Sequence, residues 1–174
     1  MRRRMIKTGR QIGRLQKDKK GVTIMPQKRT IERARRAERE GKSPSTQAGE
    51  FVREEIHHIR EGKHGARSTK QAIAIGLSKA RRAGVNLKPP EIGKVSVKTR
   101  RRAQSDFRTG QLGFITKPSP RRSRATLQAL RHEGRQAASS RALARQARLS
   151  SARKTAAARS ASAKKAAETR AAES

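Results

Sequence analysis

Residues 43–87, SPSTQAGEFVREEIHHIREGKHGARSTKQAIAIGLSKARRAGVNL, decide the fold, because they hold two amphipathic patterns with their own start and stop signals. Ser43 can cap a helix, and Pro44 is tolerated in a first helical turn. From Ala48 onward, residues placed 100° apart bring one apolar group within an arc of about 140°. This group is Ala48, Phe51, Val52, Ile56 and Ile59. The pattern predicts an amphipathic helix that ends near Gly62.

A second helix follows a short loop at residues 62–67. Ser68 and Gln71 fit a capping box, in which each side chain satisfies the other's free backbone N–H group, and Gly84 is a stop signal. Its apolar face is formed by Ala72, Ile73, Gly76, Leu77, Ala80 and Ala83. Outside that face on the helical wheel lie Lys70, Lys79, Arg81 and Arg82. Because the loop is short, the two apolar faces are expected to fold together as a helical hairpin.

Two residues depart from these patterns. Glu55 falls inside the apolar arc of the first helix, where a buried carboxylate would need a partner. We expect Glu55 instead to lie at the rim of the core with its carboxylate in water. Ile75 lies on the polar side of the second helix, and we expect an isolated exposed apolar residue, the alternative being a contact to a partner or a second copy.

The chain around this hairpin is too polar and too charged to form one large core. Its 174 residues include 46 Lys and Arg against 13 Asp and Glu, a net charge of +33, with 32% hydrophobic and 2% aromatic residues. An ordinary globular domain has roughly 45–50% apolar residues. Low hydrophobicity with high charge is typical of segments that stay disordered until a partner neutralises them. The expected partner is therefore a polyanion.

Charge and composition divide the chain into four segments. Residues 1–42 form a basic N-terminal arm, with 16 basic and 4 acidic residues. Residues 43–90 form the hairpin core, and residues 91–120 hold a short helix over 98–108 and a linker over 110–120. Residues 121–174 form a tail rich in Ala, Ser, Arg and Lys. We predict a mostly α protein, a small hairpin with long basic arms that are largely disordered or conditionally helical and unpacked.

The first residues raise a separate question. Met25-Pro26-Gln27-Lys28 looks like a natural start, and Lys19-Lys20-Gly21-Val22 can be encoded by purine-rich codons like those before a bacterial start codon. We therefore expect that translation often begins at Met25. Mass spectrometry of the native protein tests this expectation.

Several functional classes are excluded or disfavoured by residue content. Without cysteine, the chain has no disulfides, thiolate zinc sites or Cys nucleophiles. The longest apolar run apart from Gly, residues 72–77, is far shorter than the roughly 18 residues of a membrane span. No nucleophile with a base and an orienting group is evident, so we expect no enzyme and no cofactor. His57, His58, Glu61 and His64 form no known metal-ligand spacing and are expected to be solvated.

The best local phosphate site precedes the second helix. Lys63, His64 and Arg67 flank a helix N-terminus whose free N–H groups favour an anion, with Ser68, Thr69 and Lys70 in the first turn. The other expected phosphate-binding residues are Lys79, Arg81, Arg82, Arg121, Arg122 and Arg124. Two interpretations stay open for the loop, a phosphate site or a capped helix with solvated charges. Arg81 and Arg82 can equally complement the helix dipole.

Residues 43–87 resemble the core of a family of small basic bacterial proteins. The resemblance rests on the joined pattern of STQAGEF at 45–51, KHG at 63–65 and QAIAI at 71–75. It identifies kinship and implies no activity. The tail is similar to those of linker histones and histone-like nucleoid proteins, and Ser119-Pro120-Arg121-Arg122 looks like their short Ser-Pro-basic-basic motif.

These observations favour a histone-like, nucleoid-associated protein of the cytoplasm that binds DNA by phosphate neutralisation and without sequence preference. Thirty of the 46 basic residues are Arg, which can hold phosphate oxygens in pairs. Duplex DNA is favoured, and an RNA- or ribosome-binding protein is the alternative. A module that docks on a protein through the hairpin, and a precursor of a membrane-active cationic peptide, are further alternatives.

Overall fold

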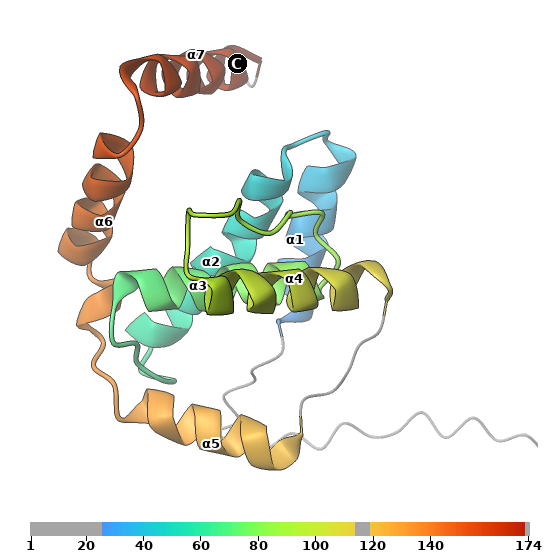
Figure 1. Cartoon of the computed structure of the whole chain (residues 1–174), viewed down its shortest axis with the longest axis vertical. Coiled ribbons are helices and arrows are strands. Elements are labelled where there is room, and N and C mark those ends of the chain that lie inside the picture. The colour runs from blue at the N-terminus through green and yellow to red at the C-terminus, as the bar shows by residue number, and fades with distance from the viewer. Residues whose placement is uncertain (1–25, 114–118, 173–174) are drawn as a thin grey trace, which may run out of the picture.

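The computed structural model describes residues 26–113 and 119–172, and all regular structure in these ranges is helical. The helices are α1 (Lys28–Arg39), α2 (Pro44–Arg60), α3 (Thr69–Arg82), α4 (Val97–Gln111), α5 (Pro120–Arg131), the 3₁₀ turn η1 (Gln136–Ala138), α6 (Ser140–Ala152) and α7 (Ala156–Ala172). Figure 1 shows their arrangement. The mostly α class is confirmed. The expected start at Met25 lies outside the described residues.

α2 and α3 form the expected hairpin, and their starts follow the expected caps. The Ser43 hydroxyl accepts a hydrogen bond from the Thr46 N–H, and the Ser68 hydroxyl accepts one from the Gln71 N–H. The second half of the capping box is corrected, because the Gln71 amide oxygen accepts from the N–H of Arg67, at 2.8 Å, and not from that of Ser68. The cap therefore also orders the end of the loop.

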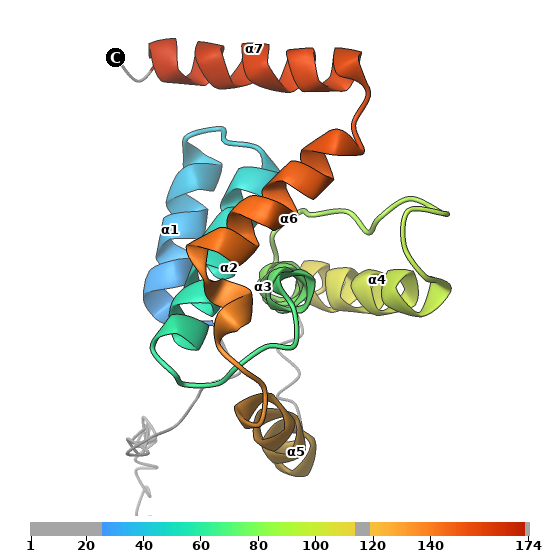
Figure 2. The same ribbon diagram turned by 90° about the vertical axis from the view of Figure 1, so that its left-hand side faces the viewer.

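Two glycines let helix backbones touch. A Cβ on Gly76 of α3 would lie 2.7 Å from the Cα of Val52 on α2, and a Cβ on Gly110 of α4 would overlap the carbonyl oxygen of Arg81. Gly110 was expected to begin a linker, whereas α4 continues through it. Figure 2 looks along α3, with α1 and α2 on one side and α4 on the other. α3 is therefore the central helix of this part of the chain.

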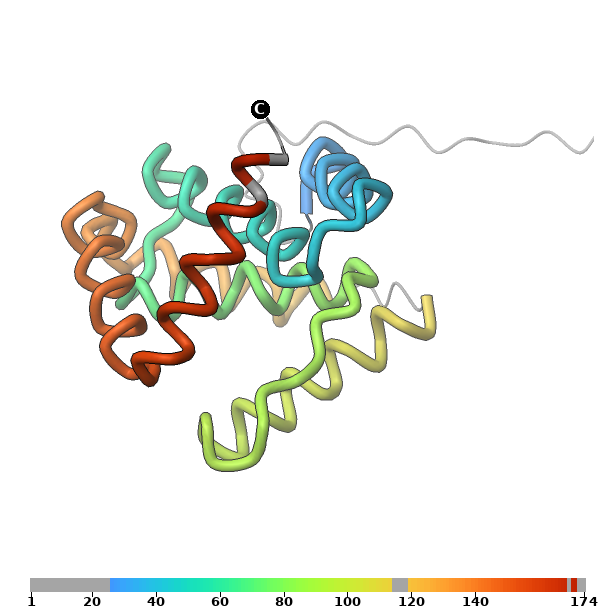
Figure 3. The backbone as a smooth tube through the Cα atoms, turned by 90° about the horizontal axis from the view of Figure 1, so that it is seen from above, coloured from blue at the N-terminus to red at the C-terminus, as the bar shows by residue number. Residues whose placement is uncertain are grey.

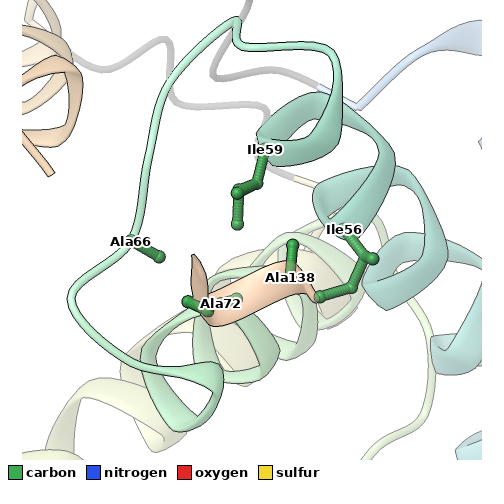
Figure 4. Packing of buried hydrophobic residues seen from close by; sticks show 6 residues of the cluster. Ile56, Ile59, Ala66, Ala72 and Ala138 are labelled. Carbon is green, nitrogen blue, oxygen red and sulfur yellow. The ribbon is translucent and has the colours of Figure 1, made fainter. Parts of the chain in front are cut away.

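The hydrophobic core has two parts and extends beyond the hairpin. One cluster joins Ala48 and Phe51 of α2, Ala80 and Val85 to Ala34 of α1. α1 thus packs on the hairpin, although it belongs to the segment expected as an N-terminal arm. The other cluster joins Ile56, Ile59, Ala66 and Ala72 to Ala137 and Ala138 of η1. Figure 4 shows Ile56 and Ile59 close to Ala138.

The beginning of the tail docks on the hairpin, which corrects the expectation that this whole segment is unpacked. The N–H groups of Gly65 and Ala66 donate to the carbonyl oxygens of Leu130 and Gly134. A Cβ on Gly65 would overlap the carbonyl oxygen of Glu133, so the two backbones require glycine at this contact. The sequence gives little indication of this docking, because its hydrogen bonds are made by backbone groups, which nearly every residue type has.

Beyond η1 the tail is helical and mostly exposed, which agrees with the expected lack of packing there. Leu143 of α6 packs against the core, whereas every side chain that the structure describes in α7 is exposed. In Figure 3, segment 83–96 runs beside α4 before turning into it, and the Arg100 guanidinium donates to the Pro90 carbonyl. Ile92 in this segment is 82% exposed.

Candidate functional site

The N-terminus of α3 presents part of the expected phosphate site. Lys63, Arg67, Ser68 and Lys70 are all exposed. The ammonium of Lys63 lies 2.8 Å from a carboxylate oxygen of Glu61, and this hydrogen bond lowers the pKa of Glu61. An anion at this helix end therefore meets Arg67 and Lys70, for which the structure shows no acidic partner among the residues it describes, and Lys63, which is already paired with Glu61.

Four of the expected phosphate-binding residues are instead buried, so the prediction is wrong for them. Thr69 donates its hydroxyl hydrogen to the carbonyl of Ala137 in the docked tail. Arg81 donates to the carbonyl of Leu87, and burial lowers the pKa of its guanidinium. The other two, His64 and Lys79, belong to a buried ionic cluster described below. None of the four can meet an external phosphate.

Arg82 is half-buried rather than free on the surface. Its Nε lies 3.7 Å from a carboxylate oxygen of Asp106 on α4, and the same carboxylate accepts a hydrogen bond from the Ser78 hydroxyl at 2.6 Å. Arg82 therefore helps to join α3 to α4. The contact with Asp106 explains why Arg82 lies near the end of α3, and no bound phosphate is needed for that explanation.

A buried ionic cluster lies between α2, α3 and the loop before α3, and consists of Glu54, Glu55, His58, His64 and Lys79. Glu55 is 0% exposed, which overturns its expected position at the rim. The ammonium of Lys79 donates to Glu55 Oε2 at 2.7 Å and lies 3.8 Å from Glu54 Oε1. Lys79, expected to bind phosphate, is thus the buried partner that a carboxylate in the apolar arc requires.

Two histidines complete the cluster, and both were expected to be solvated. His64 Nδ1 bonds the carbonyl oxygen of Gly65 at 3.0 Å, and its Nε2 lies 3.3 Å from Glu55 Oε1. His58 Nε2 lies 2.9 Å from the side-chain nitrogen of Gln27. Burial, followed by the charge of Lys79, lowers the pKa of His58, so this ring is neutral at pH 7. His57, next along α2, is exposed as expected.

The cluster leaves polar atoms unpartnered. Glu54 Oε1, Glu55 Oε1 and His58 Nδ1 are buried without a hydrogen-bond partner. Lys79 is the only lysine or arginine in the cluster, so two carboxylates face one permanent positive charge. One ligand atom each from Glu55, His58 and His64 lies within 4.8 Å of the others. The site can therefore hold a cation. The spacing Glu55-x-x-His58 places both on one face of α2 and is the signal that sequence reasoning missed.

The exposed tail carries a different kind of surface. Residues 119–172 contain 14 Lys and Arg but only two acidic residues, Glu133 and Glu168. The expected phosphate-binding residues Arg121, Arg122 and Arg124 are exposed in the first turns of α5. On α6, Arg141, Arg145 and Arg148 are exposed and share one face, because they are four and three residues apart. We call these three residues the α6 arginine stripe.

The loop before α3 and the tail meet at a cavity of about 330 Å³. Residues of the loop, including Gly62 and His64, line one side of it, and residues of the turn after α5, including Arg131 and Arg135, line the other. Both arginines are exposed. The docked tail therefore places Arg131 and Arg135 next to the loop that carries Lys63 and Arg67.

Comparison with known proteins assigns no relationship: the chain matches no family model, no curated protein and no solved structure. Among the described helices, none combines the length and apolar character that crossing a membrane requires. The functional argument therefore rests on the chemistry of the buried ionic cluster and of the exposed basic surface.

Proposed function

We propose that the protein binds nucleic acid, with duplex DNA favoured, by neutralising backbone phosphates without reading sequence. The observation that carries this proposal is the exposed basic surface of the tail, which contains almost no acidic residues. In residues 28–113 many acidic side chains are buried or ion-paired, whereas residues 119–172 expose 14 basic residues against two acidic ones. A surface of one sign attracts the opposite polyelectrolyte and releases its counterions.

The α6 arginine stripe is the best-defined part of this surface. Arg141, Arg145 and Arg148 extend over about 10 Å of helix axis at 1.5 Å per residue. None of the three forms an ion pair within the residues described, so each guanidinium is available to hold phosphate oxygens in pairs. Arginines in a row along a helix provide backbone contacts, which position a protein on nucleic acid but carry no sequence information.

Base recognition has little support in the exposed residues. The outward face of α3 offers Ala74, while the Gln71 amide is held by the cap. Phe51 is buried and the chain has neither Trp nor Tyr, so a stacking platform for single strands is not provided by these residues. Binding is therefore expected to depend on charge, and on salt, more than on base sequence.

Fluorescence anisotropy with a labelled DNA duplex, repeated over a salt series that includes about 150 mM, tests the proposal. The triple variant R141Q/R145Q/R148Q should bind more weakly and should lower the slope of log K against log salt by about 0.9 per lost contact. The matched control R35Q/R36Q/R39Q removes three exposed charges from α1. It should change the slope less.

Three results would contradict the proposal or redirect it. Loss of duplex binding at about 150 mM salt would contradict it. Equal effects of the two triple variants would remove the specific role of the α6 arginine stripe. Tighter binding to a structured RNA of equal length than to the duplex would favour the RNA-binding alternative.

A further inference from the structure

In the buried ionic cluster, a carboxylate oxygen of Glu55 and a ring nitrogen of His64 face each other. Glu55 is fully buried, and its Oε2 is bonded to Lys79 while its Oε1 has no hydrogen-bond partner. That free oxygen faces His64 Nε2, 3.3 Å away. Because His64 Nδ1 is bonded to the carbonyl of Gly65, it carries the ring proton, and Nε2 of a neutral ring presents a lone pair to a carboxylate. Two acceptors face each other unless a second ring proton or a metal ion lies between them.

The distances suit a tetrahedral metal ion. Zn²⁺ binds His nitrogen and carboxylate oxygen at about 2.0–2.2 Å, so neighbouring ligand atoms on a tetrahedron lie about 3.3 Å apart. Glu55 Oε1 and His64 Nε2 already have this separation. A ring nitrogen of His58 is the third ligand atom and lies within 4.8 Å of the other two. The rings of His58 and His64 are nearly perpendicular, with centroids 6.2 Å apart, so neither blocks the other from a shared ion.

Each of these three side chains is held by a second group, as metal ligands commonly are. Lys79 holds the other oxygen of Glu55, and the Gly65 carbonyl holds the other nitrogen of His64. The Gln27 amide lies on His58 Nε2. The end of that amide nearest Nε2 is its nitrogen, which can only donate. Metal binding at the unpartnered Nδ1 therefore requires the amide to turn its oxygen to Nε2, an exchange of two ends of nearly equal shape. The contacts of Lys79 and of the Gly65 carbonyl thus orient Glu55 Oε1 and His64 Nε2 toward each other.

We propose that Glu55, His58 and His64 bind one divalent transition-metal ion of the Zn²⁺ class. Three protein ligands leave a fourth position, which water can take. The ion adds positive charge where two buried carboxylates face one lysine. It also joins α2 to the loop whose next residue, Gly65, bonds the tail at Leu130. The site is therefore structural, and it does not depend on nucleic-acid binding.

Cobalt is the probe, because tetrahedral Co²⁺ has intense visible absorption that octahedral Co²⁺ lacks. The full-length protein, stripped with a chelator and titrated with Co²⁺, should develop these bands at one ion per chain, and Zn²⁺ should remove them by competition. The variants H58Q and H64Q should each weaken binding by more than the roughly 10–100-fold that loss of a second-shell group causes. H57Q, which changes the exposed neighbour of His58, should bind as the native protein does.

The proposal is overturned if Co²⁺ gives no tetrahedral bands, or if H57Q loses them while H58Q and H64Q retain them. Circular dichroism shows whether each variant is folded. If H58Q and H64Q do not fold, X-ray absorption of the Zn²⁺-loaded native protein decides, because the site requires two imidazoles in the first shell. Finding water and carboxylate alone would overturn it. So would NMR evidence that His64 is protonated at both nitrogens with Zn²⁺ present, since the proton would occupy the place assigned to the metal.

Discussion

Replacement of Lys79 by methionine tests the buried ionic cluster most directly. Lys79 is 2% exposed and its ammonium lies 2.7 Å from Glu55 Oε2. Methionine is of similar length and apolar, so the change removes the charge while largely keeping the volume. It leaves the carboxylates of Glu54 and Glu55 buried without the lysine. Breaking a buried ion pair in this way costs about 3–5 kcal/mol, a large fraction of the 5–15 kcal/mol of a typical domain.

Urea unfolding followed by circular dichroism, in the presence of a chelator, measures this cost. The chain has no Trp or Tyr, so helix content is the suitable signal. K70M is the matched control, because Lys70 is exposed on the same helix, and it should change the unfolding free energy by less than about 0.5 kcal/mol. The double variant E55M/K79M should recover part of the loss, since an apolar pair replaces a broken one. A cost below about 1 kcal/mol for K79M, as for a surface pair, would refute the buried arrangement.

Two further predictions concern the tail. G65A should release the docked segment, because its Cβ would overlap the Glu133 carbonyl, and trypsin should then cleave after Arg131 faster than in the native protein. The control G49A changes an exposed helical glycine with open space around it and should leave the cleavage rate unchanged. If G65A is cleaved no faster than the native protein, the docking is contradicted. A chain ending at Arg153 lacks α7, all of whose described side chains are exposed. It should bind DNA more weakly in anisotropy measurements, while the urea concentration at the midpoint of unfolding stays the same. A lower midpoint would show that α7 is packed.

Local sequence signals were sufficient for the secondary structure around the hairpin. The apolar arc of α2 and the caps at Ser43 and Ser68 lie within a few residues of the backbone they organise. The expected helix over 98–108 is likewise present inside α4. Such signals act over one or two helical turns, which is why they can be read without knowing what packs against the helix.

The candidate site was only partly predictable for the same reason. Lys63, Arg67 and the arginines at the start of α5 are exposed as expected. His64, Thr69, Lys79 and Arg81 are not, because a helical wheel counts a charged residue as solvated until another helix covers it. Glu55 and Lys79 lie on different helices, and their contact depends on how closely α3 approaches α2 at Gly76.

The sequence by itself determined that the protein is helical, that its large apolar residues gather in residues 43–87, and that its tail is strongly cationic. Each of these properties follows from composition or from a repeat within one helix. Only the tertiary structure decided that Glu55, His58, His64 and Lys79 share one buried volume, and that the turn at Leu130–Gly134 bonds the loop at Gly65. The physical reason is that burial depends on how distant segments pack together. Backbone pairing cannot be read from residue types either, because every residue has the same backbone donor and acceptor except proline, which lacks the N–H.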